Sequence, residues 1–245
     1  MGAVHVERDG QLGWVVIDNP DRRNALTGEM FRALSAGVEA LDADPAVHVV
    51  VVRGAGTQAF ASGADIGDLG NVDSGAADRP LLAAGKPIVA MIHGACIGGG
   101  LLVALGADVR VCADDARFAI PAVRLGVAYP YDGVRQLVAT VGAAAAAEIL
   151  LTGSTFGADE ALRWGFVSRV VPAAQLEAEA TALATTIAAG APLSLRAAKA
   201  SVRAAAIGAP PNSVADAIRA CWESDDFAEG RRAFAEKRPP VFRGR

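Results

Sequence analysis

The chain has 245 residues, of which 52% are hydrophobic and 20% charged, and its formal net charge is -4. A chain of this length can bury a large core, and this composition excludes an intrinsically disordered protein. Because it carries no basic stripe, we expect no nucleic-acid partner, and a ligand's phosphates would be met by a few local basic groups.

The three cysteines, Cys96, Cys112 and Cys221, stand in apolar surroundings and lack the spacing of metal ligands. We therefore expect reduced core thiols, no metal site and a cytoplasmic location. The N-terminus lacks a signal-peptide pattern, and the longest apolar runs are too short or too alanine-rich to span a bilayer. The sequence thus predicts a soluble protein without a membrane span.

The first elements are a hairpin and a helix. Val4 to Glu7 and Leu12 to Asp18 flank Asp9-Gly10, a pair that supplies the positive-φ turn of a β-hairpin. Thr27 is a good N-cap for the helix that follows, and Met30, Leu34, Val38 and Leu41 give that helix one apolar face. We expect it to end before Pro45.

The next strand runs from His48 to Arg53. Its unbroken valine run, Val49 to Val52, indicates burial on both faces of a sheet. Beyond Ala173 the chain is predicted to be helical, with breaks at Gly190-Ala191-Pro192 and at Gly208 to Pro211. The fold class is therefore α/β.

The segment from Pro87 to Leu105 combines a strand, a turn and a helix start. Ile88 to Ile92 reads as a buried strand, His93-Gly94 as a turn, and Gly98 to Gly100 open a helical run. The first N–H groups of a helix lack partners and suit an anion. The glycines fit either a tight packing turn or an oxyanion site, whereas the sequence lacks the phosphate-loop pattern. An oxyanion site needs a second donor.

A second Gly/Ala-rich turn supplies that donor. It reads Ala59-Phe60-Ala61-Ser62-Gly63-Ala64-Asp65 and follows a strand. Taken together with Pro87 to Leu105, this turn closely resembles the crotonase (enoyl-CoA hydratase/isomerase) family, whose A-F-x-x-G-A-D and G-x-x-x-G-G-G motifs bring two backbone N–H groups onto a thioester carbonyl. The resemblance implies Ala64 and Gly99 as the catalytic oxyanion donors. It also implies an acyl-CoA ligand, with coenzyme A as part of the substrate and no separate cofactor.

Further motifs extend the resemblance over almost the whole chain. Asn24-Ala25-Leu26 matches the family's element near the CoA. Residues Leu151 to Pro172 match a central segment of the family, and residues Ser224 to Arg238 match its C-terminal end. The resemblance implies a spiral of ββα units over residues 1–190. It implies a helical region over residues 191–245 that forms a homotrimer, or a hexamer as a dimer of trimers.

The resemblance also implies the ligand contacts. Residues of the core that would bind substrate or CoA are Arg22, Arg23, Ala25, Ala64, Asp65, Ile66 and Gly99. Phe234 and Lys237 belong to the segment that reaches a neighbouring subunit's CoA. Ile66 to Lys86, which normally walls the acyl site, is shorter than usual for the family, so we expect a more open or differently shaped acyl pocket.

The chain departs from the family pattern at the acid/base pair. Hydratases of this family use two glutamates, and the corresponding positions here hold Leu102 and Ala122. Neither side chain can carry a proton, so the standard hydration mechanism is not available. Oxyanion stabilisation can persist without the pair.

Asp132 is the candidate replacement for the missing carboxylates. The loop Val127 to Gly133 lies where family members with other reactions place a catalytic carboxylate. The alternative, which the sequence favours, is that Asp132 is the N-cap of a helix beginning near Gly133. Tyr129 and Tyr131 are interpreted as packing residues and His93 as a structural turn residue.

Two functions remain open at this stage. The first is an acyl-CoA lyase, isomerase or hydrolase in fatty-acid or related lipid metabolism, working through an atypical acid/base such as Asp132. The second is a catalytically inactive acyl-CoA-binding protein. The sequence favours the enzyme, but it identifies neither the acyl group nor the reaction.

Overall fold

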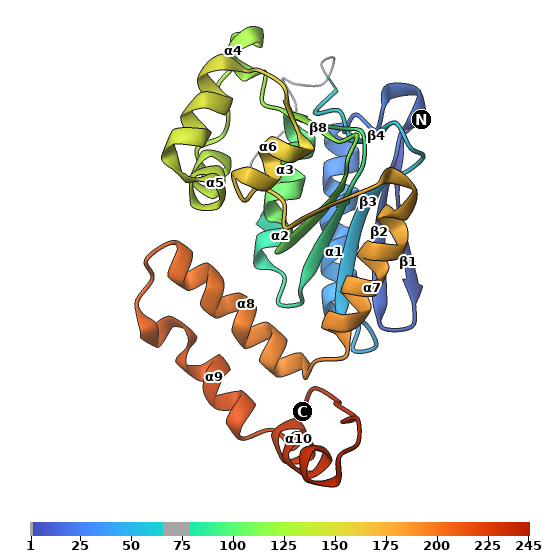
Figure 1. Cartoon of the computed structure of the whole chain (residues 1–245), viewed down its shortest axis with the longest axis vertical. Coiled ribbons are helices and arrows are strands. Elements are labelled where there is room, and N and C mark those ends of the chain that lie inside the picture. The colour runs from blue at the N-terminus through green and yellow to red at the C-terminus, as the bar shows by residue number, and fades with distance from the viewer. Residues whose placement is uncertain (1, 66–78) are drawn as a thin grey trace.

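The structure is a computed structural model that describes residues 2–65 and 79–245 (Figure 1). Ile66, predicted to touch the substrate, lies outside the described residues, as does most of the short segment that we expected to reshape the acyl pocket.

A six-stranded sheet forms the centre of the molecule. Its order is β1-β2-β3-β5-β7-β10, and every neighbouring pair is parallel except the antiparallel hairpin of β1 and β2. The strands are β1 (Ala3–Asp9), β2 (Leu12–Asp18), β3 (Val49–Gly54), β5 (Ile88–Ile92), β7 (Val109–Ala113) and β10 (Arg169–Val171). The predicted hairpin is confirmed, but Asp9 pairs with Leu12, so its turn residues are Gly10 and Gln11 rather than Asp9 and Gly10.

A smaller four-stranded sheet has the order β4-β6-β8-β9. Its strands are β4 (Ala59–Ala61), β6 (Ala95–Ile97), β8 (Arg117–Ala119) and β9 (Phe156–Gly157). Three times in succession one strand joins the large sheet, the next joins the small sheet, and a helix follows: β3-β4-α2, β5-β6-α3 and β7-β8-α4. The helices are α2 (Arg79–Ala83), α3 (Gly99–Gly106) and α4 (Ala122–Leu125). This succession agrees with the predicted ββα units.

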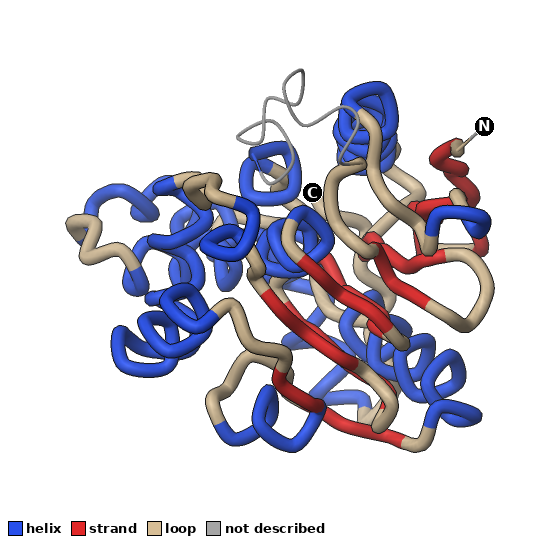
Figure 2. The backbone as a smooth tube through the Cα atoms, turned by 90° about the horizontal axis from the view of Figure 1, so that it is seen from above, coloured by secondary structure: helices blue, strands red, loops and turns tan. Residues whose placement is uncertain are grey.

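Helices cover both faces of the large sheet (Figure 2). Val50 and Val52 of β3 pack in one core cluster with α1 (Gly28–Ala43), whereas Val49 and Val51 pack in a second cluster with α7 (Leu176–Ala188). The predicted burial of this strand on both faces is confirmed. Thr27 caps α1 as predicted, because its hydroxyl accepts the N–H of Met30 at 3.2 Å.

The helix α5 (Tyr131–Thr152) includes Asp132, which the sequence had placed in the loop before it. It is long and apolar enough, by length and composition, to cross a membrane. At Gly142, however, φ is 79° and ψ is 162°, so the helix is interrupted there. Each part is far shorter than the ~20 residues that a spanning helix needs. We therefore do not assign a membrane span to α5.

The C-terminal arm, defined as residues 191–245, extends away from the two sheets (Figure 1). It follows α6 (Ala158–Arg163), β10 and α7, and contains α8 (Pro192–Ala206), α9 (Ala215–Trp222) and α10 (Asp225–Glu236). The predicted helices and breaks are confirmed. Two ion pairs tie α8 to the start of β7: the ammonium of Lys199 lies 2.9 Å, and the guanidinium of Arg203 2.8 Å, from the carboxylate of Asp108.

All three cysteines are free, as expected. Cys96 and Cys112 are buried, and burial raises the pKa of Cys96 well above its ordinary value and the pKa of Cys112 to about 12. Both are therefore protonated thiols at neutral pH. Cys221 differs from the expectation, because it lies only half-buried on the C-terminal arm.

Candidate active site

Backbone hydrogen bonds join the Arg22–Leu26 turn to the chain after β4. The N–H of Leu26 donates to the carbonyl of Gly63 (2.8 Å), and the N–H of Asp65 donates to the carbonyl of Leu26 (2.9 Å). An ion pair between Arg22 and Asp65, at 3.3 Å, lies on the same side. The structure thus brings together five of the predicted ligand contacts: Arg22, Arg23, Ala25, Ala64 and Asp65.

Asn24 holds this turn from inside the protein. Its buried side-chain amide donates to the carbonyls of Ala55 (2.9 Å) and Ala59 (2.7 Å), and its oxygen accepts the N–H of Asn19 (2.9 Å). Asn24 has a φ of 57°, a left-handed conformation that asparagine tolerates better than most residues. Because Asn24 fixes the turn, Arg22 and Arg23 point to solvent, where phosphates could reach them. Asn24 belongs to the motif that the sequence analysis identified, but the sequence did not predict that its side chain holds the turn.

The N–H groups of Ala64 and Gly99 have no hydrogen-bond partner among the described residues. The parallel bridge between Leu26 and Ala64 uses both backbone groups of Leu26, so the N–H of Ala64 takes no part in it. Gly99 begins α3, where helical N–H groups lack a partner within the helix. Two backbone donors are therefore free to bind a ligand.

These two donors lie close together. A β-carbon added at Gly99 would lie 3.1 Å from the backbone nitrogen of Ala64, and one added at Gly63 would lie 3.9 Å from that of Gly99. Gly98, the N-cap of α3, has a φ of 51° that a side chain would strain. A β-carbon at Gly100, by contrast, would meet the carbonyl oxygen of Ala61 at 2.2 Å. The glycine run therefore serves close packing at Gly100 and leaves a free donor at Gly99.

A cavity of about 370 Å³ opens beside the two donors. Its lining residues are Phe31, Ser62, Gly63, Ala64, Ile97, Gly98, Gly99, Leu102, Ile120, Pro121, Ala122, Leu125, Val127, Ala128, Tyr129 and Pro130. Leu102 enters from α3 and Ala122 from α4, so both positions that lack the expected glutamates face this cavity. The walls are mostly apolar and suit an apolar acyl group.

The polar side chains of the cavity wall, among the residues that the structure describes, are Ser62 and Tyr129. The hydroxyl of Ser62 donates to the carbonyl of Arg22 (3.0 Å), and that of Tyr129 donates to the carbonyl of Gly98 (3.2 Å). No carboxylate belongs to this described lining. The described part of the wall thus contains backbone donors for a carbonyl oxygen but no general base of the usual kind.

Asp132 lies beyond this wall. Its side chain is 49% exposed, and Arg135, one helical turn further along α5, approaches it at 3.6 Å. The helix begins at Tyr131 with Pro130 as its N-cap, so the alternative role of Asp132 as the N-cap is wrong. Asp132 instead occupies the first turn, where a negative charge interacts favourably with the helix dipole. The structure does not bring Asp132 to the two donors.

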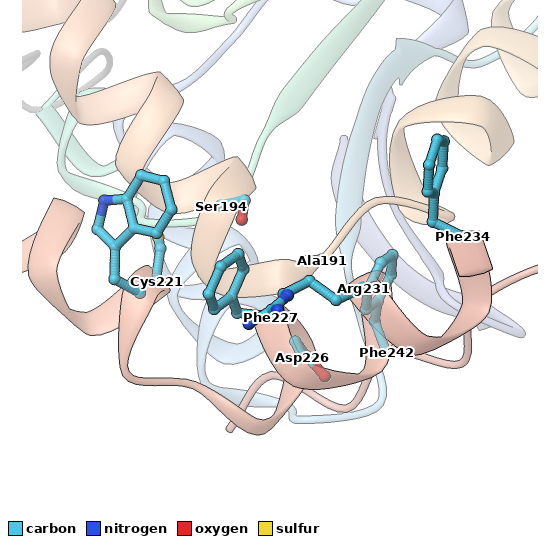
Figure 3. A pocket seen from close by; sticks show the side chains of 10 residues that line it. Ala191, Ser194, Cys221, Asp226, Phe227, Arg231, Phe234 and Phe242 are labelled. Carbon is cyan, nitrogen blue, oxygen red and sulfur yellow. The ribbon is translucent and has the colours of Figure 1, made fainter.

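Phe234 and Lys237 are exposed on the C-terminal arm, and neither of them lines the cavity. Phe234 borders a separate hollow of about 550 Å³ in the arm, together with Phe227 and Arg231 of α10 and Ser194 of α8 (Figure 3). The arm therefore does not complete the cavity of its own chain.

His93 is buried and does not line the cavity. Its Nε2 lies 3.2 Å from the carbonyl oxygen of Gly54, and its Nδ1 has no hydrogen-bond partner in the part of the chain that the structure describes. Within residues 2–65 and 79–245 no group of three or more His, Cys, Asp or Glu side chains could hold a metal ion.

Comparisons with known proteins agree on one family. The family model described as enoyl-CoA hydratase/isomerase matches residues 7–245. A probable enoyl-CoA hydratase of Mycobacterium bovis is 36% identical over 97% of this chain and 96% of its own length. A carnitinyl-CoA dehydratase of Escherichia coli is 34% identical over 99% of both chains.

Solved structures share the fold. A crystal structure described as an enoyl-CoA hydratase/carnithine racemase from Magnetospirillum magneticum has a TM-score of 0.94 and 37% identity, covering 100% of this chain and 97% of its own. A probable enoyl-CoA hydratase/isomerase from Mycobacterium abscessus has a TM-score of 0.90 and 34% identity, covering 100% of both chains. The α/β fold with its ββα units is therefore of the crotonase type.

Proposed function

The chain belongs to the enoyl-CoA hydratase/isomerase family, and from this premise we propose that it binds an acyl-CoA thioester with the carbonyl oxygen between the N–H groups of Ala64 and Gly99. The main support for this proposal is that the N–H groups of Ala64 and Gly99, which have no partner among the described residues, lie beside an apolar cavity. An apolar acyl group would occupy the cavity, and the CoA moiety would extend past the exposed Arg22 and Arg23.

Two donors aimed at a thioester oxygen favour reactions in which that oxygen becomes negative. In such sites one donor contributes roughly 3 kcal/mol to the stability of the transition state. The donors polarise the carbonyl and stabilise a thioester enolate or a tetrahedral adduct. They do not move a proton, so catalysis needs a further group.

We assign that further role to Asp132, as part of the same proposal. Arg135 lies 3.6 Å from its carboxylate, and Tyr129 and Pro130, which precede it in the chain, line the cavity. The protein would then be an acyl-CoA lyase, isomerase or hydrolase of fatty-acid or related acyl-CoA metabolism. Free thiols are consistent with work in the cytoplasm.

A second function, an inactive acyl-CoA-binding protein, is favoured by one observation. The described cavity wall has no carboxylate, and Leu102 and Ala122 face it in place of the two glutamates. Such a protein would keep the affinity for acyl-CoA and show no turnover.

The assembly proposed for either function is a homotrimer, or a hexamer made of two trimers. It is supported by the exposed aromatic residues of the C-terminal arm, of which Phe234 is 87% and Trp222 65% exposed. In that assembly Phe234 and Lys237 would contact the CoA bound to a neighbouring subunit. Analytical ultracentrifugation measures the subunit number directly, and a monomer at micromolar concentration would contradict the assembly.

Calorimetric titration with CoA, acetyl-CoA and longer acyl-CoAs tests the binding. We expect acyl-CoAs to bind more tightly than CoA alone, because only they have a thioester carbonyl that can lie between the two donors. No binding at millimolar concentration would contradict the proposal.

Turnover of the same acyl-CoAs separates the enzyme from the binding protein. Ala64→Pro removes one donor N–H, and Ala64→Gly keeps it, so the two variants form a matched pair. If the protein is an enzyme, the proline variant loses turnover and the glycine variant retains it. If purified wild-type protein turns over none of the acyl-CoAs that it binds, the binding protein is correct.

A further inference from the structure

Tyr129 contacts the peptide group that carries one of the two donors. Its hydroxyl donates a hydrogen bond to the carbonyl oxygen of Gly98 at 3.2 Å. The same oxygen accepts the N–H of Leu102 (3.1 Å), the first hydrogen bond of α3. The N–H of Gly98, on its other side, donates to the carbonyl of Ala119 (2.8 Å).

The carbonyl of Gly98 and the N–H of Gly99 belong to one peptide unit. A peptide bond is planar, and the structure has no cis peptide bond among the residues that it describes, so these two groups point in opposite directions. A hydrogen bond that fixes the direction of the carbonyl therefore also fixes the direction of the Gly99 N–H. It also polarises the peptide unit, because hydrogen bonds in a chain strengthen one another.

This part of the chain needs such a restraint. Gly98, the N-cap of α3, has no β-carbon to restrict its backbone dihedral angles, and it provides no side chain to cap the helix. Tyr129 reaches it from a loop that is 31 residues further along the chain. The ring of Tyr129 also packs against Gly133, where an added β-carbon would lie 2.9 Å from a ring carbon. The start of α5 thus holds the ring in place.

We propose that Tyr129 is a positioning residue, whose hydroxyl aims and polarises the Gly99 N–H toward the thioester carbonyl. This inference rests on the proposed acyl-CoA function and assigns Tyr129 a role that differs from the packing role predicted from sequence. It places no proton transfer on the tyrosine.

The test uses para-dimethylaminocinnamoyl-CoA, a thioester whose visible absorption band moves to longer wavelength when its carbonyl is polarised. Tyr129→Phe keeps the ring and removes the hydroxyl. Tyr131→Phe is the matched control, because Tyr131 is 78% exposed and does not line the cavity. The absorption spectrum of the bound probe is recorded for wild-type protein and both variants, and the dissociation constant is taken from the same titration.

We expect the dissociation constant of Tyr129→Phe for the probe to lie within about threefold of the wild-type value. The shift of the absorption band should be about 10–30% smaller, because each hydrogen bond in a chain strengthens the next by about that fraction. Tyr131→Phe should give the wild-type shift. Because only folded protein binds the probe, partial unfolding would lower the amplitude of the shifted band and leave its position unchanged.

The outcomes separate this inference from the function on which it rests. If wild-type protein shifts the band and Tyr129→Phe shifts it equally, the positioning role is wrong and the acyl-CoA proposal stands. If wild-type protein neither binds the probe nor shifts its band, the acyl-CoA proposal fails and the role of Tyr129 fails with it.

Discussion

The α-carbon of Gly99 faces the backbone nitrogen of Ala64 so closely that an added β-carbon would lie 3.1 Å from it. The same β-carbon would lie 3.1 Å from the ring of Phe31, a buried residue of α1 that also lines the cavity. A methyl group at this position would therefore push the two donors apart or displace the cavity wall.

Gly99→Ala should weaken the preference for acyl-CoA over CoA. The N–H remains, but its direction changes, so the thioester carbonyl should lose part of its hydrogen bonding and acetyl-CoA should lose part of its advantage over CoA. Calorimetry with acetyl-CoA and CoA measures the preference. Gly157→Ala is the control, since the nearest atom to its added β-carbon is a side-chain nitrogen at 3.9 Å. Equal preferences in wild type and Gly99→Ala would contradict the role of Gly99.

Wild-type protein should hydrate crotonyl-CoA very slowly or not at all. Leu102 and Ala122 face the cavity but cannot exchange a proton, and each general acid or base typically contributes ~10²–10⁴-fold. The loss of enoyl absorbance in the ultraviolet measures the rate. A rate near ~10 s⁻¹, the median for enzymes, would show that another group replaces the glutamates.

Restoring both carboxylates should raise that rate if the donors are correctly placed. The double variant Leu102→Glu, Ala122→Glu is compared with Leu102→Gln, Ala122→Gln, which matches it in size and polarity but takes up no proton. A gain in the glutamate variant alone is the expected result. Equal rates in the two folded double variants would show that the cavity does not present a substrate to these positions.

Asp132→Asn tests the carboxylate outside the wall. If Asp132 is the acid or base, kcat should fall ~10²-fold or more with little change in melting temperature. Arg135→Gln is the control, because it breaks the same ion pair, at 3.6 Å, without removing the carboxylate. An exposed pair of this kind contributes only about 0–1 kcal/mol to stability. Full activity of Asp132→Asn would remove Asp132 from the mechanism.

Lys199 should make the stability depend on pH above neutrality. Burial lowers its pKa from 10.5 to about 8, against the opposing attraction of Asp108, while Arg203 lowers it further and Asp42 raises it. Between those two values the unfolded chain binds more protons at this group than the folded chain does. The free energy of unfolding therefore rises with pH in that window, by at most roughly 3 kcal/mol, and the full burial cost is present below about pH 8.

Denaturant unfolding of wild type and Lys199→Met, from pH 7 to pH 11, isolates this contribution. The wild-type free energy should rise relative to the variant as the pH increases through the window, since the variant lacks the titrating group. Lys86, whose pKa burial also lowers, is present in both proteins, so its titration contributes to both curves. Parallel curves would show that Lys199 does not titrate differently on folding.

The sequence predicted the elements with strong local signals. The hairpin, the Thr27 cap and the valine strand each depend on residues close together in the chain. The sequence did not predict β6 between β5 and α3, because a three-residue strand is too short to show a period. It also did not predict the buried Lys86 and Lys199, whose ammonium groups bind the backbone carbonyl of Leu41 and the carboxylate of Asp108, respectively.

The site was predictable only in part for the same reason. The Gly/Ala-rich turns were visible as motifs, and the structure brings Ala64 and Gly99 together. The bond from Tyr129 to Gly98 depends on how the loop before α5 folds over α3, and no local pattern reveals it. Asp132 was selected by its place in a loop, and that place says nothing about the direction of its side chain, which lies outside the described cavity wall.

A crystal structure of the protein with acetyl-CoA tests the central claim most directly. The account predicts the thioester oxygen within about 2.7–3.1 Å of the backbone nitrogens of both Ala64 and Gly99, with the acyl group in the cavity that Leu102 and Ala122 line. A bound acetyl-CoA whose carbonyl oxygen contacts neither nitrogen would contradict it.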